Sequence, residues 1–585
     1  MKRILAILSV LLVLLALLTA CNTDPSLDPA DDAITTASPE TAAQAEELVI
    51  IKDNVANYRI IRAEEAEAST IDAAARLCKL INQETGVLLD LSTDWVKRGT
   101  ELNRESLEIL VGHTAYEESA QALEGLAYGD YIVTHIGNKL VINAWGAEGL
   151  RAGVSALAQK LYTHAEAGNF SLPADIHIVG TEIKLANELP VYTGGNVRTV
   201  YHCGDNNQML IIDNTNPTEY TAYCGTLESA GYTKYTENDI AGNRFATYIN
   251  DKYVINAGYY VYESASRIII EPRTTLPKLE SENQYTKAIA PSVAMLGLEF
   301  PQSDGDITTN GLCLVFQLAD GSYIIVDGGL YSERDAKALF DYLHTHAPDK
   351  NNITIAAWII THGHGDHNGT WFKFTEIYAN RVKLELMIAN FPSDEACTEV
   401  VSGATGASGT KSMNYVKKYK GAEFIKTHVG HTFFIRDAKI EMLYTAESYA
   451  PAILDHYNTS SLIFTVELAG QKFNILGDAT HYACDITHKM YGDYLKADFV
   501  QTAHHGMGTG PDTYYGVTDV YTKSAAPVVL WPCGDAVYEG MHKRPQSAHL
   551  QNLSTTKEIF VAGSRVVRLQ LPYAYGTSEY ETIRK

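Results

Sequence analysis

A group of side chains that commonly bind metals follows an apolar run in the C-terminal half of this chain. Residues 353–360 are almost all apolar, and they are followed by His362, His364, Asp366 and His367 with glycines between them. The run predicts a buried strand, and the glycines predict a tight turn at its end. Such a turn can direct His362 and His364 toward one point and Asp366 and His367 toward another, so that two cations lie about 3.5 Å apart. This spacing is far more specific than a lone histidine, and it predicts a two-metal hydrolase with Asp366 as ligand and catalytic group.

Length and charge limit the alternatives. A chain of 585 residues is too long for one hydrophobic core, so several domains are expected. Its 46 basic and 70 acidic residues give a net charge of −24, which disfavours non-specific binding to nucleic acid or to an anionic membrane through the whole-molecule field. Because 14 of the 19 histidines lie between His344 and His549, the chemistry is expected in the C-terminal half.

The N-terminus has the features of a secretion signal. Two basic residues precede an apolar run at residues 4–18, which is short for a membrane span and ends in small residues. The Leu-Thr-Ala-Cys sequence that ends at Cys21 resembles the bacterial lipobox, in which the cysteine is lipidated. Residues 1–21 are therefore expected to be a lipoprotein signal peptide, and Cys21 an extracytoplasmic anchor in the bacterial cell membrane. An ordinary signal peptide is the alternative. Residues 22–46, rich in Ser, Thr, Asp, Pro and Ala, predict a disordered linker.

Two small α+β domains are expected before the histidine-rich part. Residues 47–180 alternate strand-like and helical segments in an order that resembles the accessory α/β domain preceding the barrel in several glycoside hydrolases. This resemblance implies a carbohydrate-proximal module, with a structural spacer as the alternative. Residues 181–291 predict a small α+β domain rich in tyrosines, which either stack on sugars or pack in a core.

The remaining residues, 292–585, carry the histidine motif within a recognisable order of elements. Strands at 312–318 and 322–326 lead into Asp327 and two glycines, and a helix at 332–346 leads to the strand before His362. This order is similar to that of the metallo-β-lactamase superfamily. The resemblance implies an α/β fold, the αββα sandwich of that family, with the metals at one edge between two sheets. Asp327, at the end of its strand, is expected to hydrogen bond to a ligand histidine.

Later motifs follow the family in the same order. A strand at 472–476 is followed by Gly-Asp478, and the resemblance implies that Asp478 bridges both metals. A strand at 498–503 leads to His504 and His505, where family members place the last histidine ligand. His504 is the preferred ligand and His505 the alternative, and the other histidine of this pair is expected to face the substrate.

The third histidine ligand of the first metal has no clear match. The hydrolase domain of the bacterial competence DNA-uptake channel instead has an Asp-x-Asn-x-x-Ser-Leu segment. The similar segment here has His456 at the aspartate position, followed by Asn458. The resemblance makes His456 the expected ligand and Asn458 the second candidate, or a residue that supports the ligands. His428 and His431 fit less well and are expected at the surface.

One further histidine lies near a proline, as in the competence-channel group. His542 would protonate a leaving oxygen or contact a phosphate, with Lys543 and Arg544 adding positive charge. A solvent-exposed loop is the alternative for this segment.

The expected activity is metal-dependent hydrolysis. Two divalent metal ions would share a bridging water as hydroxide; zinc is the default for imidazole ligands, with manganese or iron as alternatives. The shared motifs favour a phosphodiester or related phosphoester bond in a small-molecule or cell-wall substrate, with nucleic acid as a further candidate. Hydrolysis of a β-lactam, lactone or thioester is the first alternative function. A surface carbohydrate-binding protein with a degenerate metal domain is the second.

Overall fold

The computed structural model describes residues 46–204, 206–298, 311–393, 396–397, 408–508, 514–580 and 582–584. The predicted signal peptide, the lipidation site Cys21 and nearly all of the linker lie outside these residues. From Glu47 onward the chain forms one compact unit. Within the described ranges, no helix is long and apolar enough to cross a bilayer.

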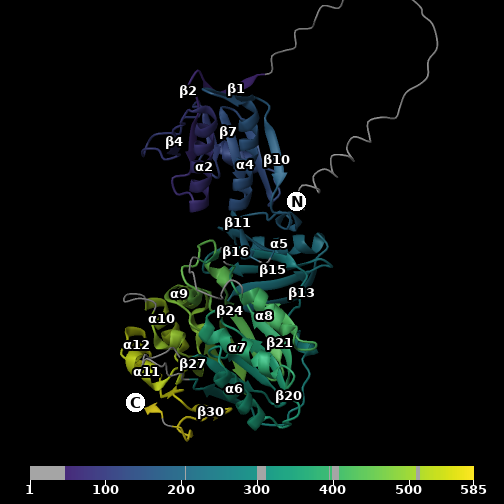
Figure 1. The fold of residues 1–585 in the computed structure, drawn as a ribbon, viewed down its shortest axis with the longest axis vertical. Helices are drawn as coiled ribbons and strands as arrows, with labels where there is room; N and C mark the ends of the chain where they lie inside the picture. Colours follow the sequence, from purple (N-terminus) through teal and green to yellow (C-terminus); the bar gives the residue numbers. More distant parts are fainter. Residues whose placement is uncertain are drawn as a thin grey trace, which may run out of the picture. The chain divides into compact units, whose positions relative to one another are not determined.

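The first part of the chain forms two sheets, with helices packed against the larger one (Figure 1). In the larger sheet neighbouring strands are parallel from β4 through β3 and β5 to β7, whereas β6 is antiparallel to both of its neighbours, β7 and β10. Helix α2 buries Ala74, Leu77 and Ile81, which recur at helical spacing, and it ends at Gly86 in the left-handed conformation. The elements are β1 (Glu47–Lys52), β2 (Val55–Ala56), β3 (Arg59–Arg62), α2 (Ala68–Thr85), β4 (Leu91–Thr93), β5 (Glu108–Val111), α3 (Glu117–Leu123), β6 (Asp130–Ile136), β7 (Lys139–Ala144), α4 (Ala147–His164), β8 (Ala165–Glu166), β9 (Asn169–Pro173) and β10 (His177–Thr181).

The middle part is a six-stranded antiparallel sheet, named here the middle sheet, with α5 packed against it. Helix α5 begins after Asn216, whose side chain accepts hydrogen bonds from the N–H groups of Thr218 and Glu219. The elements are β11 (Asn196–Gly204), β12 (Asn207–Asp213), α5 (Pro217–Ser229), β13 (Thr233–Ile240), β14 (Asn243–Ile249), β15 (Tyr253–Tyr260) and β16 (Ala265–Pro272). Several tyrosines considered for sugar stacking are buried, which supports their packing role: Tyr220, Tyr223, Tyr232, Tyr248, Tyr259 and Tyr260.

Two further sheets face each other in the C-terminal part, named here the catalytic domain. The first sheet has the order β22-β21-β20-β19-β18-β17-β30 and the second β23-β24-β25-β26-β27-β28-β29-β31. The first comprises β17 (Ser292–Leu296), β18 (Cys313–Gln317), β19 (Tyr323–Asp327), β20 (Ile353–Ile359), β21 (Val382–Ala389), β22 (Glu423–Lys426) and β30 (Val566–Gln570). The second comprises β23 (Thr432–Ile435), β24 (Ala438–Tyr444), β25 (Ile463–Leu468), β26 (Gln471–Ile475), β27 (Phe499–Gln501), β28 (Val528–Trp531), β29 (Glu558–Val561) and β31 (Ile583–Arg584).

Helices cover the outer faces of both sheets (Figure 1). They are α6 (Glu333–His346), α7 (Gly365–Tyr378) and α8 (Ser408–Val416) on the first sheet, and α9 (His481–Tyr491), α10 (Tyr515–Ser524), α11 (Asp535–Met541) and α12 (Pro545–Asn552) on the second. Between the sheets the rings of Phe316 and Phe473 pack edge to face. Trp358 and Trp371 pack between the first sheet and its helices, and Trp531 lies in the core of the second. The predicted αββα sandwich is therefore confirmed.

Parallel strands bring the predicted site residues to one edge. Strands β19 and β20 are parallel; Asp327 is the last residue of β19, and Thr361 lies in the loop after β20. Strands β26, β27 and β28 are also parallel, and the loops after them hold Asp478, His505 and Pro532. Because the carboxyl ends of parallel strands meet at one edge of a sheet, these loops gather side chains from distant parts of the sequence.

Candidate metal centre

Asp366, His367, Asp478 and His505 form a cluster of ligand atoms that all lie within 4.8 Å of one another. Asp366 and His367 belong to the first turn of α7, whereas Asp478 follows β26 and His505 follows β27. His367 Nε2 lies 3.1 Å from Asp478 Oδ2, and His505 Nε2 lies 3.5 Å from Asp478 Oδ1. Two imidazoles and two carboxylates at this spacing suit a divalent cation.

Hydrogen bonds behind the two histidines determine which ring nitrogen faces the cluster. His367 Nδ1–H donates to Asp327 Oδ2 over 2.7 Å, and His505 Nδ1–H donates to the carbonyl oxygen of Pro532 over 2.9 Å. Each bond leaves Nε2 as the nitrogen that faces Asp478 and that can offer a lone pair to a metal ion in place of a proton. The structure thus places Asp327 behind a ligand histidine, and it gives Pro532 a matching position that the sequence did not suggest.

Asp327 is itself held by the strand end that precedes the histidine motif. The Thr361 N–H donates to Asp327 Oδ1 and the Thr361 hydroxyl to Oδ2, each over 2.7 Å. Asp327 has a φ of 55°, in the left-handed region that costs an L-residue roughly 1–2 kcal/mol. The backbone strain therefore lies at the residue that orients His367.

Asp327→Asn is expected to weaken zinc binding by about 10- to 100-fold, because the substituted amide no longer accepts all of these bonds as a carboxylate does. Zinc titration against a chromophoric chelator measures the change. Asp320→Asn is a matched control, since Asp320 lies before β19 and bonds to Ser322 and Arg436 instead. Equal zinc affinity in Asp327→Asn and the wild-type protein would remove Asp327 from the metal centre.

The chain turns through three consecutive left-handed residues at the paired histidines. His504, His505 and Gly506 have φ values of 47°, 51° and 80°. This turn directs His505 inward, where its side chain is fully buried, and leaves 19% of the His504 side chain exposed. His505 Nε2 lies 3.8 Å from Asp366 and 3.5 Å from Asp478, and His504 Nε2 lies 3.8 Å from Asp478, so the structure favours the alternative, His505, as the histidine shared with Asp366. Which of the two histidines binds a metal stays a prediction, because the direction of each side chain depends on backbone angles that a pair of identical residues does not reveal.

His362 and His364 converge on a second point beside Asp478. His362 Nε2 lies 3.0 Å from His364 Nδ1 and 4.0 Å from Asp478 Oδ2. Two ligands of a tetrahedral ion with bonds of about 2.0 Å lie roughly 3.3 Å apart, so this spacing fits a shared cation. The His456 ring lies 5.2 Å from the His364 ring, and His456 Nδ1 accepts a hydrogen bond from the Asn458 N–H over 3.1 Å. Nε2 is then the His456 nitrogen that would serve as a ligand.

Asn458 and His504 lie together next to the shared carboxylate. Asn458 Nδ2 is 3.2 Å from His504 Nε2, which is 3.8 Å from Asp478 Oδ2. Asn458 is buried, whereas the His504 side chain is partly exposed. These two side chains therefore form a polar, partly accessible flank of the site.

The charges of the site shift its pKa values in opposite directions. Burial lowers the pKa of His362 well below its ordinary value, and the neighbouring His367 lowers it further. Burial opposes a charge on His367 too, yet Asp478 and Asp327 raise its pKa well above the ordinary value. Burial works to raise the pKa of Asp478, but His367 and His505 hold it well below its usual range. The Asp478 carboxylate thus remains ionised and creates a negative field that favours a cation.

Several buried atoms of the site have no hydrogen-bond partner in the part of the chain that the structure describes. They are Nε2 of His367 and His505, Oδ1 of Asp478 and Asn458, and Nδ1 of His504. Each such atom costs about 1–3 kcal/mol, so their concentration at one place indicates a ligand that satisfies them. Imidazole nitrogens around a carboxylate with two oxygens fit two divalent metal ions.

His542 has other neighbours in the structure. His542 is the residue that follows α11. Its ring stacks on the Tyr538 ring, and its Nδ1–H donates a hydrogen bond to the Tyr538 carbonyl oxygen over 3.0 Å. Lys543 and Arg544 are exposed. A catalytic role for His542 stays a prediction, as does the alternative of a solvent-exposed loop.

His428 and His431, expected at the surface, are buried. His428 Nδ1 lies 3.1 Å from Glu447 Oε2, and its Nε2 lies 3.4 Å from Glu271 Oε1. His431 Nε2 lies 2.9 Å from Asn256 Oδ1. The prediction was wrong because Asn256 and Glu271 belong to the middle sheet, whose packing over this segment is not visible in the local sequence.

Two supporting residues became evident only in the structure. The Ser461 hydroxyl accepts a hydrogen bond from the Asp478 N–H over 3.2 Å, and the Leu462 N–H donates to the Thr361 carbonyl over 2.9 Å. Ser461 and Leu462 are the last two residues of the Asn-x-x-Ser-Leu pattern. That pattern was the available signal, since it joins the bridging carboxylate to the strand end before His362.

Comparison with known proteins identifies the domain that contains the site. Residues 307–506 match the family model described as the metallo-beta-lactamase superfamily, which confirms the predicted resemblance. No curated protein matches the chain. The resemblance of residues 47–180 to the accessory domain of glycoside hydrolases stays a prediction.

Solved structures with similarity to the chain include three proteins of low sequence identity. The metallo-beta-lactamase fold protein YhfI from Bacillus subtilis is 13% identical, with 48% of this chain and 100% of that chain covered and a TM-score of 0.32. Zinc-bound PqqB from Methylobacterium extorquens is 12% identical, with 48% and 100% covered and a TM-score of 0.31. CmlA, a diiron β-hydroxylase from Streptomyces venezuelae, is 11% identical, with 52% and 55% covered and a TM-score of 0.29.

Proposed function

We propose that this chain is an extracytoplasmic hydrolase of phosphodiester or related phosphoester bonds. The proposal starts from residues 307–506, which form a domain of the metallo-beta-lactamase superfamily. The observation that carries the proposal is that two groups of ligand atoms share Asp478. His367 Nε2 and His362 Nε2 lie 3.1 and 4.0 Å from Asp478 Oδ2, and His505 Nε2 lies 3.5 Å from Asp478 Oδ1. Two metal positions bridged by one carboxylate suit the displacement of one phosphoester oxygen by another.

The residues of the site hold this arrangement in advance. When bound, two divalent cations supply the charge that brings the pKa of water near neutrality and offsets the charge on the leaving oxygen. Asp327 and the Pro532 carbonyl keep the Nε2 atoms of His367 and His505 directed at Asp478. Because these bonds already exist in the folded protein, the ligands need no rearrangement during the reaction.

The flank formed by Asn458 and His504 supports an anionic substrate with several oxygens. The Asn458 amide has two N–H groups, and one of them is directed at His504 Nε2 over 3.2 Å. The partly exposed imidazole of His504 is a further hydrogen-bonding group beside the metal positions. A phosphodiester has two non-bridging oxygens that such groups can contact, which a single lactam carbonyl does not offer.

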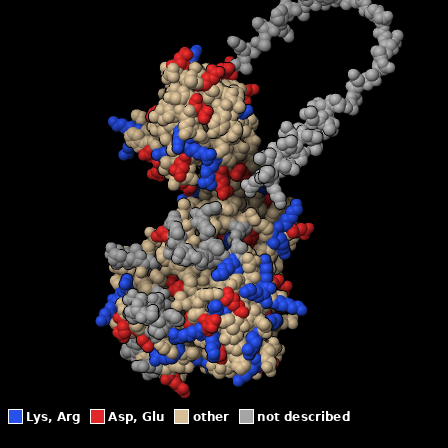
Figure 2. All heavy atoms as spheres, viewed as in Figure 1, with Lys and Arg blue, Asp and Glu red and all other residues tan. Residues whose placement is uncertain are grey.

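A basic surface of the catalytic domain also supports an anionic polymer as substrate. Figure 2 shows lysine and arginine side chains gathered over the part that contains α6, α7 and α8. Lys373 and Lys411 lie over the ring of Tyr331 at 4.4 and 5.9 Å from its centre, and Arg381 and Lys418 are exposed. In a chain with a net charge of −24, such a surface attracts polyanions locally.

The proposed location rests on the lipoprotein signal at residues 1–21. An enzyme anchored through Cys21 outside the membrane meets cell-wall polymers joined by phosphodiesters, and we propose this substrate class. Replacement of Cys21 by alanine is expected to abolish incorporation of a radiolabelled fatty acid and to release the protein from the membrane fraction. A variant that remains labelled would remove the anchor from the proposal.

The test of the activity is hydrolysis of bis(p-nitrophenyl) phosphate, measured beside nitrocefin and a thioester. The chelated protein is expected to be inactive and to recover with about two equivalents of zinc or manganese. Asp366→Ala is expected to stay inactive, whereas Asp341→Ala, which removes an exposed partner of Lys337, is expected to be fully active. Turnover of nitrocefin alone would assign lactam hydrolysis, and a protein without metal or turnover would favour the carbohydrate-binding alternative.

A further inference from the structure

A single segment of the catalytic domain connects the metal centre to the middle sheet. Residues 445–462 join β24 to β25 and carry His456 and Asn458. The segment contains two short 3₁₀ helices, η4 (Ala446–Tyr449) near its start and η5 (Tyr457–Ser460) near its end. Its end lies beside Asp478 and its start lies against β16, so it spans the distance between the ligands and the middle sheet.

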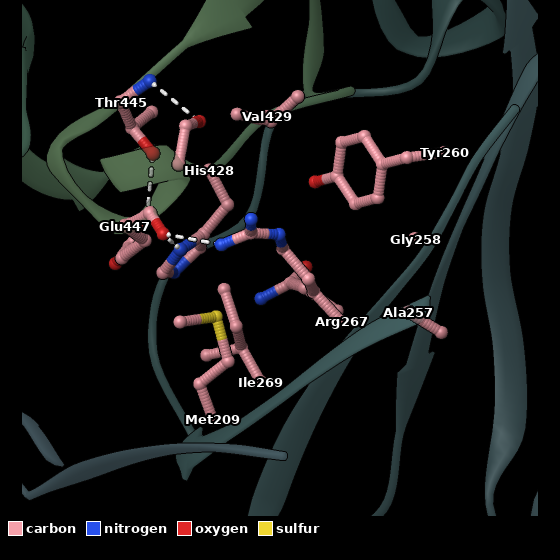
Figure 3. A pocket seen from close by; sticks show the side chains of 12 residues that line it. Met209, Ala257, Gly258, Tyr260, Arg267, Ile269, His428, Val429, Thr445 and Glu447 are labelled. Carbon is pink, nitrogen blue, oxygen red and sulfur yellow. Dashed lines mark hydrogen bonds and ion pairs between the residues drawn. The ribbon is translucent and has the colours of Figure 1, made fainter. Parts of the chain in front are cut away.

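Arg267 of β16 binds the start of this segment. Its Nη1 donates to the carbonyl oxygens of Glu447 and Ala450 over 3.0 Å each, and its Nη2 donates to Glu263 over 3.2 Å. Figure 3 shows the guanidinium of Arg267 extending from the sheet toward Glu447. Only 9% of Arg267 is exposed, so these charge-assisted bonds form in a largely water-free interface where they are strong.

The Glu447 carboxylate provides a second connection to the same strand. It accepts hydrogen bonds from the Thr445 hydroxyl over 2.8 Å and from Asn390 Nδ2 over 2.9 Å, and His428 Nδ1 lies 3.1 Å away. His428 Nε2 lies 3.4 Å from Glu271 of β16. Burial opposes a charge on His428, but Glu447 and Glu271 raise its pKa to about 9, so at neutral pH a cation joins the two carboxylates.

The interface around these groups is closely packed. The cavity between Arg267, His428 and Glu447 has a volume of about 20 Å³, which is enough for one water molecule (Figure 3). A change at Arg267 is therefore transmitted to the backbone of η4 and is not absorbed by free space.

The middle of the segment is also held, just before His456. The Leu454 N–H donates to the Ala396 carbonyl over 2.9 Å, and Leu454 pairs with Cys397 in a parallel β-bridge. Between Ala450 and Leu454 there is too little chain to relax a shift at the Arg267 end. The position of His456 is thus tied to the bonds that the middle sheet makes.

We propose that Arg267 and Glu271 of the middle sheet are positioning residues for the first metal position, acting through Glu447 and the following backbone on His456 and Asn458. The middle sheet would then be a part of the hydrolase site and not a separate binding module. The kinetic consequence of this inference rests on the proposed function, whereas its consequence for metal binding does not.

Arg267→Gln in the full-length protein is the test, with zinc titrated against a chromophoric chelator. One zinc site is expected to keep its affinity, because Asp366, His367 and His505 are not part of the connection, and the other is expected to weaken about tenfold or more. Arg244→Gln is the matched control, since Arg244 of β14 bonds to Thr221 within the middle part and should leave both sites unchanged.

Two further measurements separate positioning from general stability. Arg267→Lys keeps a buried cation and donors and is expected to recover most of the zinc affinity. Backbone hydrogen exchange in Arg267→Gln is expected to accelerate in residues 446–460 while β12 and β15 stay protected. The inference is overturned if both sites of Arg267→Gln bind zinc with unchanged affinity. It is also overturned if the zinc affinity of both sites falls equally while hydrogen exchange accelerates throughout the middle sheet. If the wild-type protein shows the expected zinc pattern but no phosphodiester hydrolysis, only the proposed function fails.

Discussion

Asp478→Asn is expected to lower kcat/KM for bis(p-nitrophenyl) phosphate by about 10³-fold or more. Both oxygens of Asp478 face histidines: His367 Nε2 and His362 Nε2 lie 3.1 and 4.0 Å from Oδ2, and His505 Nε2 lies 3.5 Å from Oδ1. Loss of the shared carboxylate should therefore weaken both metal positions together. A 10³-fold fall in kcat/KM corresponds to a loss of about 4 kcal/mol of transition-state stabilisation. This loss lies within the several kcal/mol that a metal ion supplies.

Initial rates and metal content after gel filtration measure the effect of Asp478→Asn. Asp485→Asn is the matched control, because Asp485 lies on α9 shortly after the site and pairs with Lys489 at the surface. The control is expected to retain wild-type rates and metal content. If Asp478→Asn retained two metals and normal turnover, the shared carboxylate would have to be another residue.

The second large effect separates the two adjacent histidines. His505→Ala is expected to reduce bound zinc from about two equivalents to about one and to lower kcat by about 10²-fold or more, because it removes a buried ligand. His504→Ala is expected to keep both metals and to lose no more than about tenfold in rate. Its Nε2 lies 3.2 Å from the Asn458 amide and 3.8 Å from Asp478.

We expect zinc stoichiometry and steady-state kinetics of the two variants, measured side by side, to show which of the two histidines binds the metal. The opposite ranking, with the metal lost in His504→Ala and kept in His505→Ala, would restore the register preferred from the sequence.

Ligand types were easier to predict from the sequence than the choice between neighbours. His362, His364, Asp366 and His367 share one strand end and the first turn of α7, so local spacing is enough to direct them to two points. The choice between His504 and His505 depends on φ values of 47° and 51°, which no local pattern encodes.

Contacts between distant segments account for the remaining differences. His428 was expected at the surface, but Glu271 from the middle sheet lies 3.4 Å from its Nε2. The bond from Arg267 to Glu447 joins residues 180 positions apart, so the function of the middle part was not readable from its own sequence. The predicted helix at 332–346, by contrast, agrees with α6 (Glu333–His346), because a cap and an apolar period define it locally.

The pairing of β17 with β30 determines when the catalytic domain can fold. Ser292 of β17 pairs with Gln570 of β30, so this sheet closes only after nearly the whole polypeptide has been synthesised. The middle sheet is made from strands close together in sequence and can form while the ribosome is still translating. A product truncated before Val566 would leave β17 as an open edge, which is prone to intermolecular pairing and hence to aggregation.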